Sequence, residues 1–195
     1  MDADGGFGGS VGGDALGDCG MVGRGRRKRL PHHKKEQPRR NLLSMAKQKV
    51  YLEDLHVGQK FSAGSYEMTE QRMKEFAAEF DPQPFHLEEE AGARSILKGL
   101  AASGWHTAAA TMRMLVESDL ALSEGIVGVG GEISWPRPTR AGDVLRIECE
   151  VLEILPSRSK PMQGIARIRT TTLNQNNEVA QLFTSSVVVF RRNPG

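Results

Sequence analysis

The sequence predicts an α+β domain in which an antiparallel β-sheet wraps around one long central α-helix. Over residues 70–80 and 103–122, apolar residues recur at helical spacing. From residue 126 onward they alternate with polar residues, as in strands that bury one face. Helices that precede a run of antiparallel strands, instead of alternating with strands, are typical of α+β domains.

The first half of the domain predicts a strand and three helices. Residues 60–68 form the strand, and Thr69 is of a type that caps helix N-termini, so an amphipathic helix over 70–80 follows. Two prolines prevent that helix from continuing, and residues 87–94 predict a short acidic helix. The stretch 103–122 has few charged residues, which predicts a helix buried around most of its circumference.

The second half predicts four strands, over 126–135, 143–153, 164–173 and 179–191. In 143–153, Leu, Ile, Cys and Val alternate with Arg and Glu, which is typical of a half-buried antiparallel strand. An Asn-Gln-Asn-Asn run before the last strand predicts a turn.

Residues 1–44 do not have the composition of a folded domain. Residues 1–25 contain ten glycines, and 24–40 contain nine Lys and Arg. Such a segment buries too little apolar surface to offset the entropy lost on ordering. We therefore predict a disordered, Gly-rich and basic leader over 1–44 and one domain over 45–195. An alternative expectation is that translation starts at Met45, which would leave this leader out of the native product.

The composition of the domain excludes several classes of protein. The chain has 26 Lys and Arg against 24 Asp and Glu, of which the leader holds 9 and 5, so the remaining 17 and 19 make the domain slightly acidic. This charge gives no indication of nucleic-acid binding. No apolar run has the length of a membrane span. Cys19 and Cys149 do not make a disulfide framework, so we expect a cytoplasmic protein.

The best candidate for chemistry is the segment Asp81–His86, which reads Asp-Pro-Gln-Pro-Phe-His. Its two prolines restrict the backbone between a carboxylate and an imidazole. Such a pair can hold a water molecule and move its protons, which is general acid–base catalysis. The structural alternative is an Asp that caps the N-terminus of a following helix, with a solvent-exposed His.

Ser103 and Gly104 stand where the long helix is predicted to begin. Free backbone N–H groups at a helix start can bind a developing oxyanion, and glycine lets a ligand approach closely. An ordinary Ser cap is the alternative. His106, one turn later, is expected to be a core histidine bonded to a backbone carbonyl. The sequence has no Cys/His cluster with the spacing of a metal site.

Together these residues resemble the MaoC-like dehydratases, which include (R)-specific enoyl-CoA hydratases. That family has an Asp-x-Asn-Pro-x-His segment followed by a glycine at the head of a central helix, matched here by Asp81–His86 and Gly104. The resemblance covers residues 50–192. It implies a hotdog fold, a homodimer, a 2-enoyl thioester of coenzyme A as substrate, and reversible addition of water without a further cofactor.

The resemblance also implies roles for single residues. Asp81 and His86 would hold the catalytic water, and the N–H of Gly104, next to Ser103, would bind the thioester oxygen. Two positions depart from the family pattern. Gln83 replaces the usual Asn, and a serine that some hydratases have further down the helix falls near Thr111.

Three other functions fit parts of this pattern. A hotdog thioesterase would use a carboxylate and a helix start to cleave the thioester, but the paired His86 favours hydration. A non-catalytic acyl-CoA-binding module is supported by the Gln83 departure. Nucleic-acid binding through residues 24–40 would depend strongly on salt.

Overall fold

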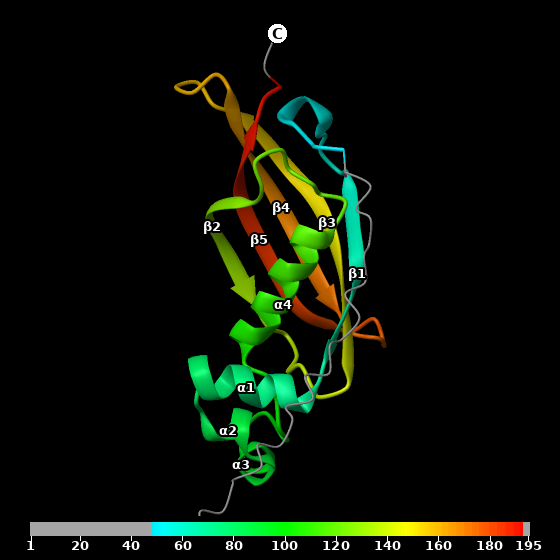
Figure 1. The fold of residues 1–195 in the computed structure, drawn as a ribbon, viewed down its shortest axis with the longest axis vertical. Helices are drawn as coiled ribbons and strands as arrows, with labels where there is room; N and C mark the ends of the chain where they lie inside the picture. The colour runs from blue at the N-terminus through cyan, green and yellow to red at the C-terminus, as the bar shows by residue number, and fades with distance from the viewer. Residues whose placement is uncertain (1–47, 193–195) are drawn as a thin grey trace, which may run out of the picture. The chain divides into compact units, whose positions relative to one another are not determined.

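The computed structural model describes residues 48–192 (Figure 1). In chain order, its helices and strands are the 3₁₀ helix η1 (Leu52–Asp54), β1 (Lys60–Met68), α1 (Glu70–Phe80), α2 (Pro84–Leu87), α3 (Glu89–Arg94), α4 (Gly104–Glu117), β2 (Val127–Ser134), β3 (Asp143–Pro156), β4 (Gln163–Leu173) and β5 (Val179–Phe190). The predicted leader over 1–44 lies outside the described residues.

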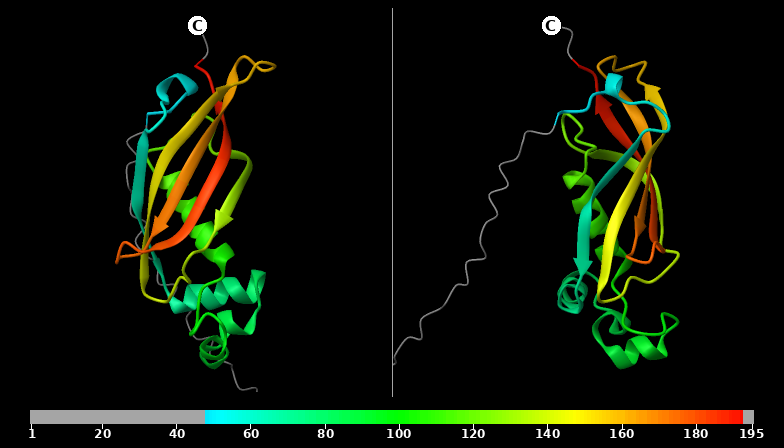
Figure 2. Two further views of the ribbon diagram at one scale, coloured as in Figure 1. Left: turned by 180° about the vertical axis from the view of Figure 1, so that it is seen from behind. Right: turned by 90° about the vertical axis from the view of Figure 1, so that its right-hand side faces the viewer.

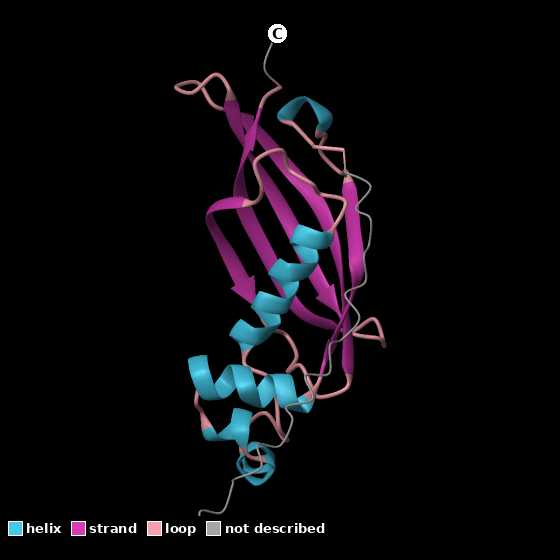
Figure 3. Ribbon diagram, viewed as in Figure 1, coloured by secondary structure: helices cyan, strands magenta, loops and turns pink. Residues whose placement is uncertain are grey.

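The five strands form one antiparallel sheet in the order β1-β3-β4-β5-β2. Helix α4 lies across one face of this sheet, and α1, α2 and α3 gather beyond one end of it (Figures 2 and 3). The predicted α+β class, with an antiparallel sheet packed around a long helix, is confirmed.

The core lies between α4 and the inner face of the sheet. On β3, the residues that alternate with Arg and Glu are at most 2% exposed, as the pattern over 143–153 predicts: Leu145, Ile147, Cys149 and Val151. Burial raises the pKa of the Cys149 thiol, so it stays protonated at neutral pH. Burying four such side chains supplies several kcal/mol of hydrophobic stabilisation.

Helix α4 corrects one prediction, because it is buried on one side only and ends at Glu117, five residues earlier than expected. Trp105, Met112 and Val116 are 61%, 40% and 65% exposed. The sheet covers only the opposite side of the helix, whose buried residues are His106, Thr107, Ala110, Thr111, Met114 and Leu115. The exposed stripe carries apolar side chains, so sequence alone could not distinguish it from the buried face.

The helices that precede α4 follow their sequence signals closely. Helix α1 has the predicted bounds, and the Thr69 hydroxyl accepts a hydrogen bond from the backbone N–H of Arg72. The predicted helix over 87–94 is present as α3, which begins two residues later than expected. Helix α2, which Pro84 starts at its first position, was not predicted. Within 48–192, none of the helices has the length and apolarity needed to cross a membrane.

Candidate active site

The ends of α1 and α2 place Asp81 and His86 side by side. Asp81 is the residue at which α1 ends, and His86 lies in α2. The backbone N–H of Gln83 donates to the Asp81 carbonyl at 2.7 Å, and the N–H of His86 donates to the Gln83 carbonyl at 2.9 Å. These two bonds, with the two prolines, restrain the backbone of the segment, as the sequence predicts.

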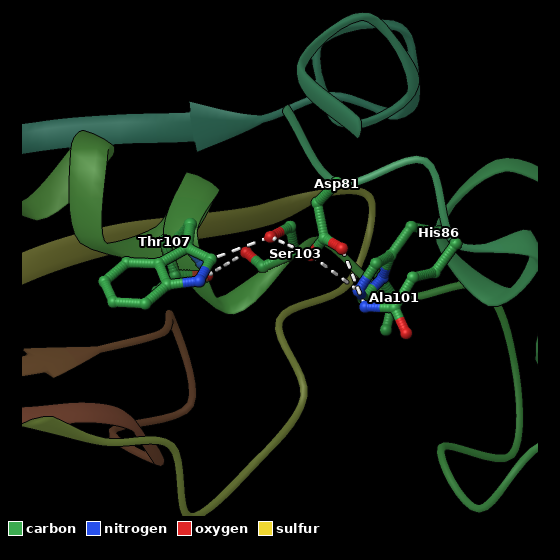
Figure 4. A network of polar contacts seen from close by, with 7 residues as sticks. Asp81, His86, Ala101, Ser103 and Thr107 are labelled. Atoms are coloured by element: carbon green, nitrogen blue, oxygen red, sulfur yellow. Dashed lines mark hydrogen bonds and ion pairs between the residues drawn. The ribbon is translucent and has the colours of Figure 1, made fainter. Parts of the chain in front are cut away.

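Asp81 has three polar partners, of which Figure 4 labels Ser103 and His86. Its Oδ2 accepts a hydrogen bond of 2.6 Å from the Ser103 hydroxyl and lies 3.3 Å from His86 Nε2. Its Oδ1 accepts one of 2.7 Å from Gln83 Nε2. The longer amide at position 83 therefore still reaches the carboxylate.

These contacts decide the charge of Asp81. Partial burial raises the pKa of its carboxyl, but hydrogen bonds from Ser103 and Gln83, together with the electrostatic influence of the nearby His86 ring, more than offset it. The net effect holds the pKa of Asp81 below its ordinary value. Asp81 is therefore a carboxylate at neutral pH.

His86 is oriented by a carbonyl far away in the sequence. Its Nδ1 lies 2.8 Å from the Ala101 carbonyl oxygen. Because a carbonyl only accepts, Nδ1 carries the hydrogen, and Nε2 faces Asp81. The ring is only 6% exposed. The alternative expectation of a solvent-exposed His is therefore wrong.

Ser103 connects the start of α4 to the carboxylate. Its hydroxyl donates to Asp81 and accepts from the backbone N–H of Trp105 at 3.2 Å. The side chain is completely buried. It is thus a helix cap, as the structural alternative proposed, and also a partner of Asp81.

We expect Ser103→Ala to affect stability and Asp81 together. Loss of the cap should lower the free energy of unfolding by about 0.5–2 kcal/mol. Loss of the donor to Asp81 should bring the carboxyl pKa closer to its ordinary value. Urea denaturation and carbon-13 NMR titration of Asp81 measure the two effects. Ser103→Thr, which keeps the hydroxyl, is the control, and an unchanged Asp81 titration in Ser103→Ala would contradict this account.

Gly104 is the first residue of α4; its backbone N–H is free, and the Trp135 ring packs closely against it. Among the described residues, no backbone or side-chain acceptor pairs with its N–H. A Cβ at this position would lie 2.9 Å from Cε2 of the Trp135 ring. Glycine is therefore required here because an indole packs against the helix start, a contact that sequence reasoning missed.

A cavity of about 390 Å³ opens beside these groups. It is lined by Phe85, His86, Ile96, Leu97, Ala101, Ala102, Gly104, Thr107, Trp135, Pro136, Arg137, Pro138 and Thr139. The lining is mostly apolar. Its polar groups are the His86 imidazole, the start of α4, the hydroxyls of Thr107 and Thr139, which bond each other, and the Arg137 guanidinium, which pairs with Glu178. Such a cavity suits an apolar ligand with a few polar groups. Over residues 48–192, no cluster of His, Cys, Asp and Glu has the arrangement of a metal site.

His106 lies outside this cavity and is a core residue, as predicted, but it lacks the predicted hydrogen bond. Its ring stacks on Phe76, with centroids 4.7 Å apart and planes inclined by 5°. Its Nδ1 is buried and finds no hydrogen-bond partner within residues 48–192. The expected bond to a backbone carbonyl is made by His86 instead. Burial, and secondarily the charge of Arg72, lower the pKa of His106, so its ring is neutral in the fold.

This burial predicts a stability that falls on acidification. The unfolded chain protonates His106 near its ordinary pKa of 6.5, before the folded protein does. The stability is therefore full above that pH and declines as the pH falls toward the lowered pKa of the folded state. Urea denaturation at a series of pH values should show this slope, and His106→Phe should reduce it. An equal slope in both proteins would contradict the assignment.

The fold and the site define a hotdog-fold protein with a carboxylate–imidazole pair beside a helix start. Residues 54–174 match the MaoC like domain, and the chain belongs to that family. A MaoC-like dehydratase from Rhodospirillum rubrum is 55% identical to it, with a TM-score of 0.73 over 74% of this chain and 99% of that one.

Two further relatives extend the comparison. An (R)-hydratase from A. caviae involved in PHA biosynthesis is 27% identical, with a TM-score of 0.54 over 71% of this chain and 98% of that chain. The uncharacterized protein YdeM of Bacillus subtilis is 30% identical over 64% of this chain and 87% of its own length.

Proposed function

We propose that the protein adds water reversibly to the C2=C3 bond of a 2-enoyl thioester, with coenzyme A as the carrier. The observation that carries this proposal is the Asp81–His86 pair beside a cavity that the free N–H of Gly104 also lines. The related (R)-hydratase supports the same reaction class.

In the proposed reaction the thioester oxygen accepts a hydrogen bond from Gly104 N–H, at the positive end of the α4 dipole. This bond withdraws electrons from C3. A water molecule beside the pair donates hydrogen bonds to the Asp81 carboxylate and to His86 Nε2, since both atoms accept. The water oxygen then bonds to C3 while the pair takes its proton, and the electrons of C2=C3 move toward the thioester oxygen. Delivery of a proton from the pair to C2 restores the carbonyl.

The reaction needs no cofactor beyond the coenzyme A of the substrate, and we place it in the cytoplasm. Thioester hydrolysis is the second candidate function, because hotdog thioesterases also use a carboxylate and the N-terminus of a helix. The close Asp81–His86 contact favours hydration, since two proton-transfer groups are needed to move protons between water and C2. The binding-module alternative loses its support, because Gln83 still bonds Asp81.

Two assays on the same sample separate these reactions. Purified protein is mixed with short and medium trans-2-enoyl-CoAs, and loss of the conjugated enoyl absorbance is recorded beside release of free thiol with a disulfide reagent. Hydration predicts absorbance loss without thiol. Thiol release in step with absorbance loss would establish the thioesterase, and tight binding without either signal would establish the binding module.

We also propose that a second copy of this chain forms a dimer with the first. It would cover the exposed apolar residues of α4, which are Trp105, Met112 and Val116, and the edge of the sheet formed by β2. Strand β2 is an edge strand with exposed valines, and Val129 is 60% exposed. Unpaired strand edges and adjoining apolar residues are typical of interfaces.

Val129→Lys should convert the proposed dimer into a monomer, because a charge on the edge strand opposes pairing. Light scattering after gel filtration measures the mass. Val57→Lys, at another exposed valine (62%), is the matched control and should stay dimeric. A monomeric wild-type protein would overturn this proposal.

A further inference from the structure

Arg140 lies outside the motif but is tied to the loop beside the site. This residue precedes β3 and is partly buried. Its guanidinium donates to three backbone carbonyls of the segment 97–100. Nη1 donates to the carbonyls of Gly99 and Leu100 at 2.8 Å each, and Nη2 donates to the Leu97 carbonyl.

The loop that Arg140 binds has an unusual backbone. Lys98 and Gly99 have φ angles of 56° and 141°, in regions that L side chains seldom adopt. These backbone conformations help direct the carbonyls of Leu97, Gly99 and Leu100 toward the same guanidinium. Without a cation there, the dipoles of these neighbouring carbonyls would repel each other. A cation at that point offsets the repulsion. The loop is also packed tightly, since a Cβ on Gly92 would lie 2.6 Å from the Gly99 carbonyl carbon.

No carboxylate of the described residues competes for this guanidinium. Among the ion pairs between described residues, none includes Arg140. Asp143 instead accepts the backbone N–H of Arg140 at 2.7 Å, which fixes where the side chain begins. The planar guanidinium can serve several carbonyls at once, whereas a lysine ammonium is a point charge.

The bound loop leads directly to the carbonyl that orients His86. Ala101 follows Leu100, and its carbonyl lies 2.8 Å from His86 Nδ1. The next N–H, of Ala102, donates to the carbonyl of Thr139 at 2.9 Å, immediately before Arg140. The Ala101 carbonyl is thus held on both sides by the segment 139–140.

We propose that Arg140 is a positioning residue, which holds the Ala101 carbonyl against His86 Nδ1 and so keeps the hydrogen on Nδ1 and Nε2 directed at Asp81. The expected effect of Arg140 on turnover rests on the proposed hydration activity, but its expected effect on the orientation and tautomer of the His86 ring does not. A ring that turns or exchanges tautomer would no longer present Nε2 to the water.

The test compares Arg140→Lys and Arg140→Ala with Arg167→Lys, an exposed arginine on β4 that pairs with Glu153. Nitrogen-15 NMR of the full-length protein reports which ring nitrogen of His86 carries the hydrogen. Enoyl-CoA kinetics, with and without methylguanidine, report kcat and KM.

We expect both Arg140 variants to mix the His86 tautomers and to lower kcat by about 10²-fold, because a small misplacement of a reacting group costs that much. Methylguanidine should restore Arg140→Ala in part, and Arg167→Lys should match the wild type.

The outcomes remain distinguishable. A wild-type His86 spectrum in both folded Arg140 variants would overturn the positioning role, whatever the activity. If Arg140→Ala does not fold, the spectrum and kcat of Arg140→Lys decide alone. If the wild type hydrates no enoyl-CoA while the variants alter the His86 tautomer, the proposed function fails and the positioning role stands.

Discussion

Asp81→Asn and His86→Asn should each lower kcat for enoyl-CoA hydration by about 10²–10⁴-fold, the typical contribution of general acid–base catalysis. Asn at position 81 removes the charge that takes the proton. It can still accept from Gln83 on one side and place its NH₂ toward Ser103 and His86 on the other, so the variant should fold. Asn at position 86 removes the imidazole next to the water.

The matched controls are Asp119→Asn and His56→Asn, which alter an exposed carboxylate and an exposed imidazole elsewhere. Steady-state kinetics on the enoyl-CoA, with circular dichroism to verify folding, measure the effect. Near wild-type turnover in both site variants would falsify the assignment of this pair.

Gly104→Ala should damage both stability and turnover. The new Cβ would lie 2.9 Å from the Trp135 ring, so the indole or the start of α4 must shift. Overpacking of this kind typically costs about 1–3 kcal/mol. A displaced helix start also moves the N–H that would bind the thioester oxygen, and a shift approaching 1 Å should lower kcat by about 10²-fold.

Gly64→Ala is the matched control, because a Cβ added at Gly64 would have no neighbouring atom within 4 Å. Urea denaturation and enoyl-CoA kinetics measure the two effects. Combining Gly104→Ala with Trp135→Leu should recover part of the lost stability, since the smaller side chain leaves room for the Cβ. A single Gly104→Ala protein as stable and active as the wild type would show that the close contact relaxes freely.

The spacing of apolar residues and the helix-capping residues predicted much of the secondary structure, because residues close in sequence determine it. Alternation along β3 placed Leu145 and Ile147 in the core, and the Thr69 cap with helical spacing gave the bounds of α1. Asp81 and His86 were identifiable because two prolines constrain the few residues between them. Those features depend on separations of a few residues, where backbone geometry leaves few choices.

The remaining contacts join residues far apart in the chain. His86 meets the Ala101 carbonyl across 15 positions, and Arg140 reaches Gly99 across 41. No periodicity encodes such pairs, so the orienting carbonyl and the role of Arg140 were invisible in the sequence. The buried side of α4 also could not be predicted, because its exposed stripe is equally apolar. Which side of α4 is buried depends on how the sheet packs against the helix, and that packing depends on strand pairings between residues far apart in the sequence.

The most direct test of the proposed chemistry is mass spectrometry of the product formed from a trans-2-enoyl-CoA in water enriched in heavy oxygen, with Asp81→Asn in parallel. The proposal predicts an intact 3-hydroxyacyl-CoA that carries one heavy oxygen on C3, formed by the wild type and nearly absent with Asp81→Asn. A free carboxylic acid carrying the label, or equal product from both proteins, would contradict it.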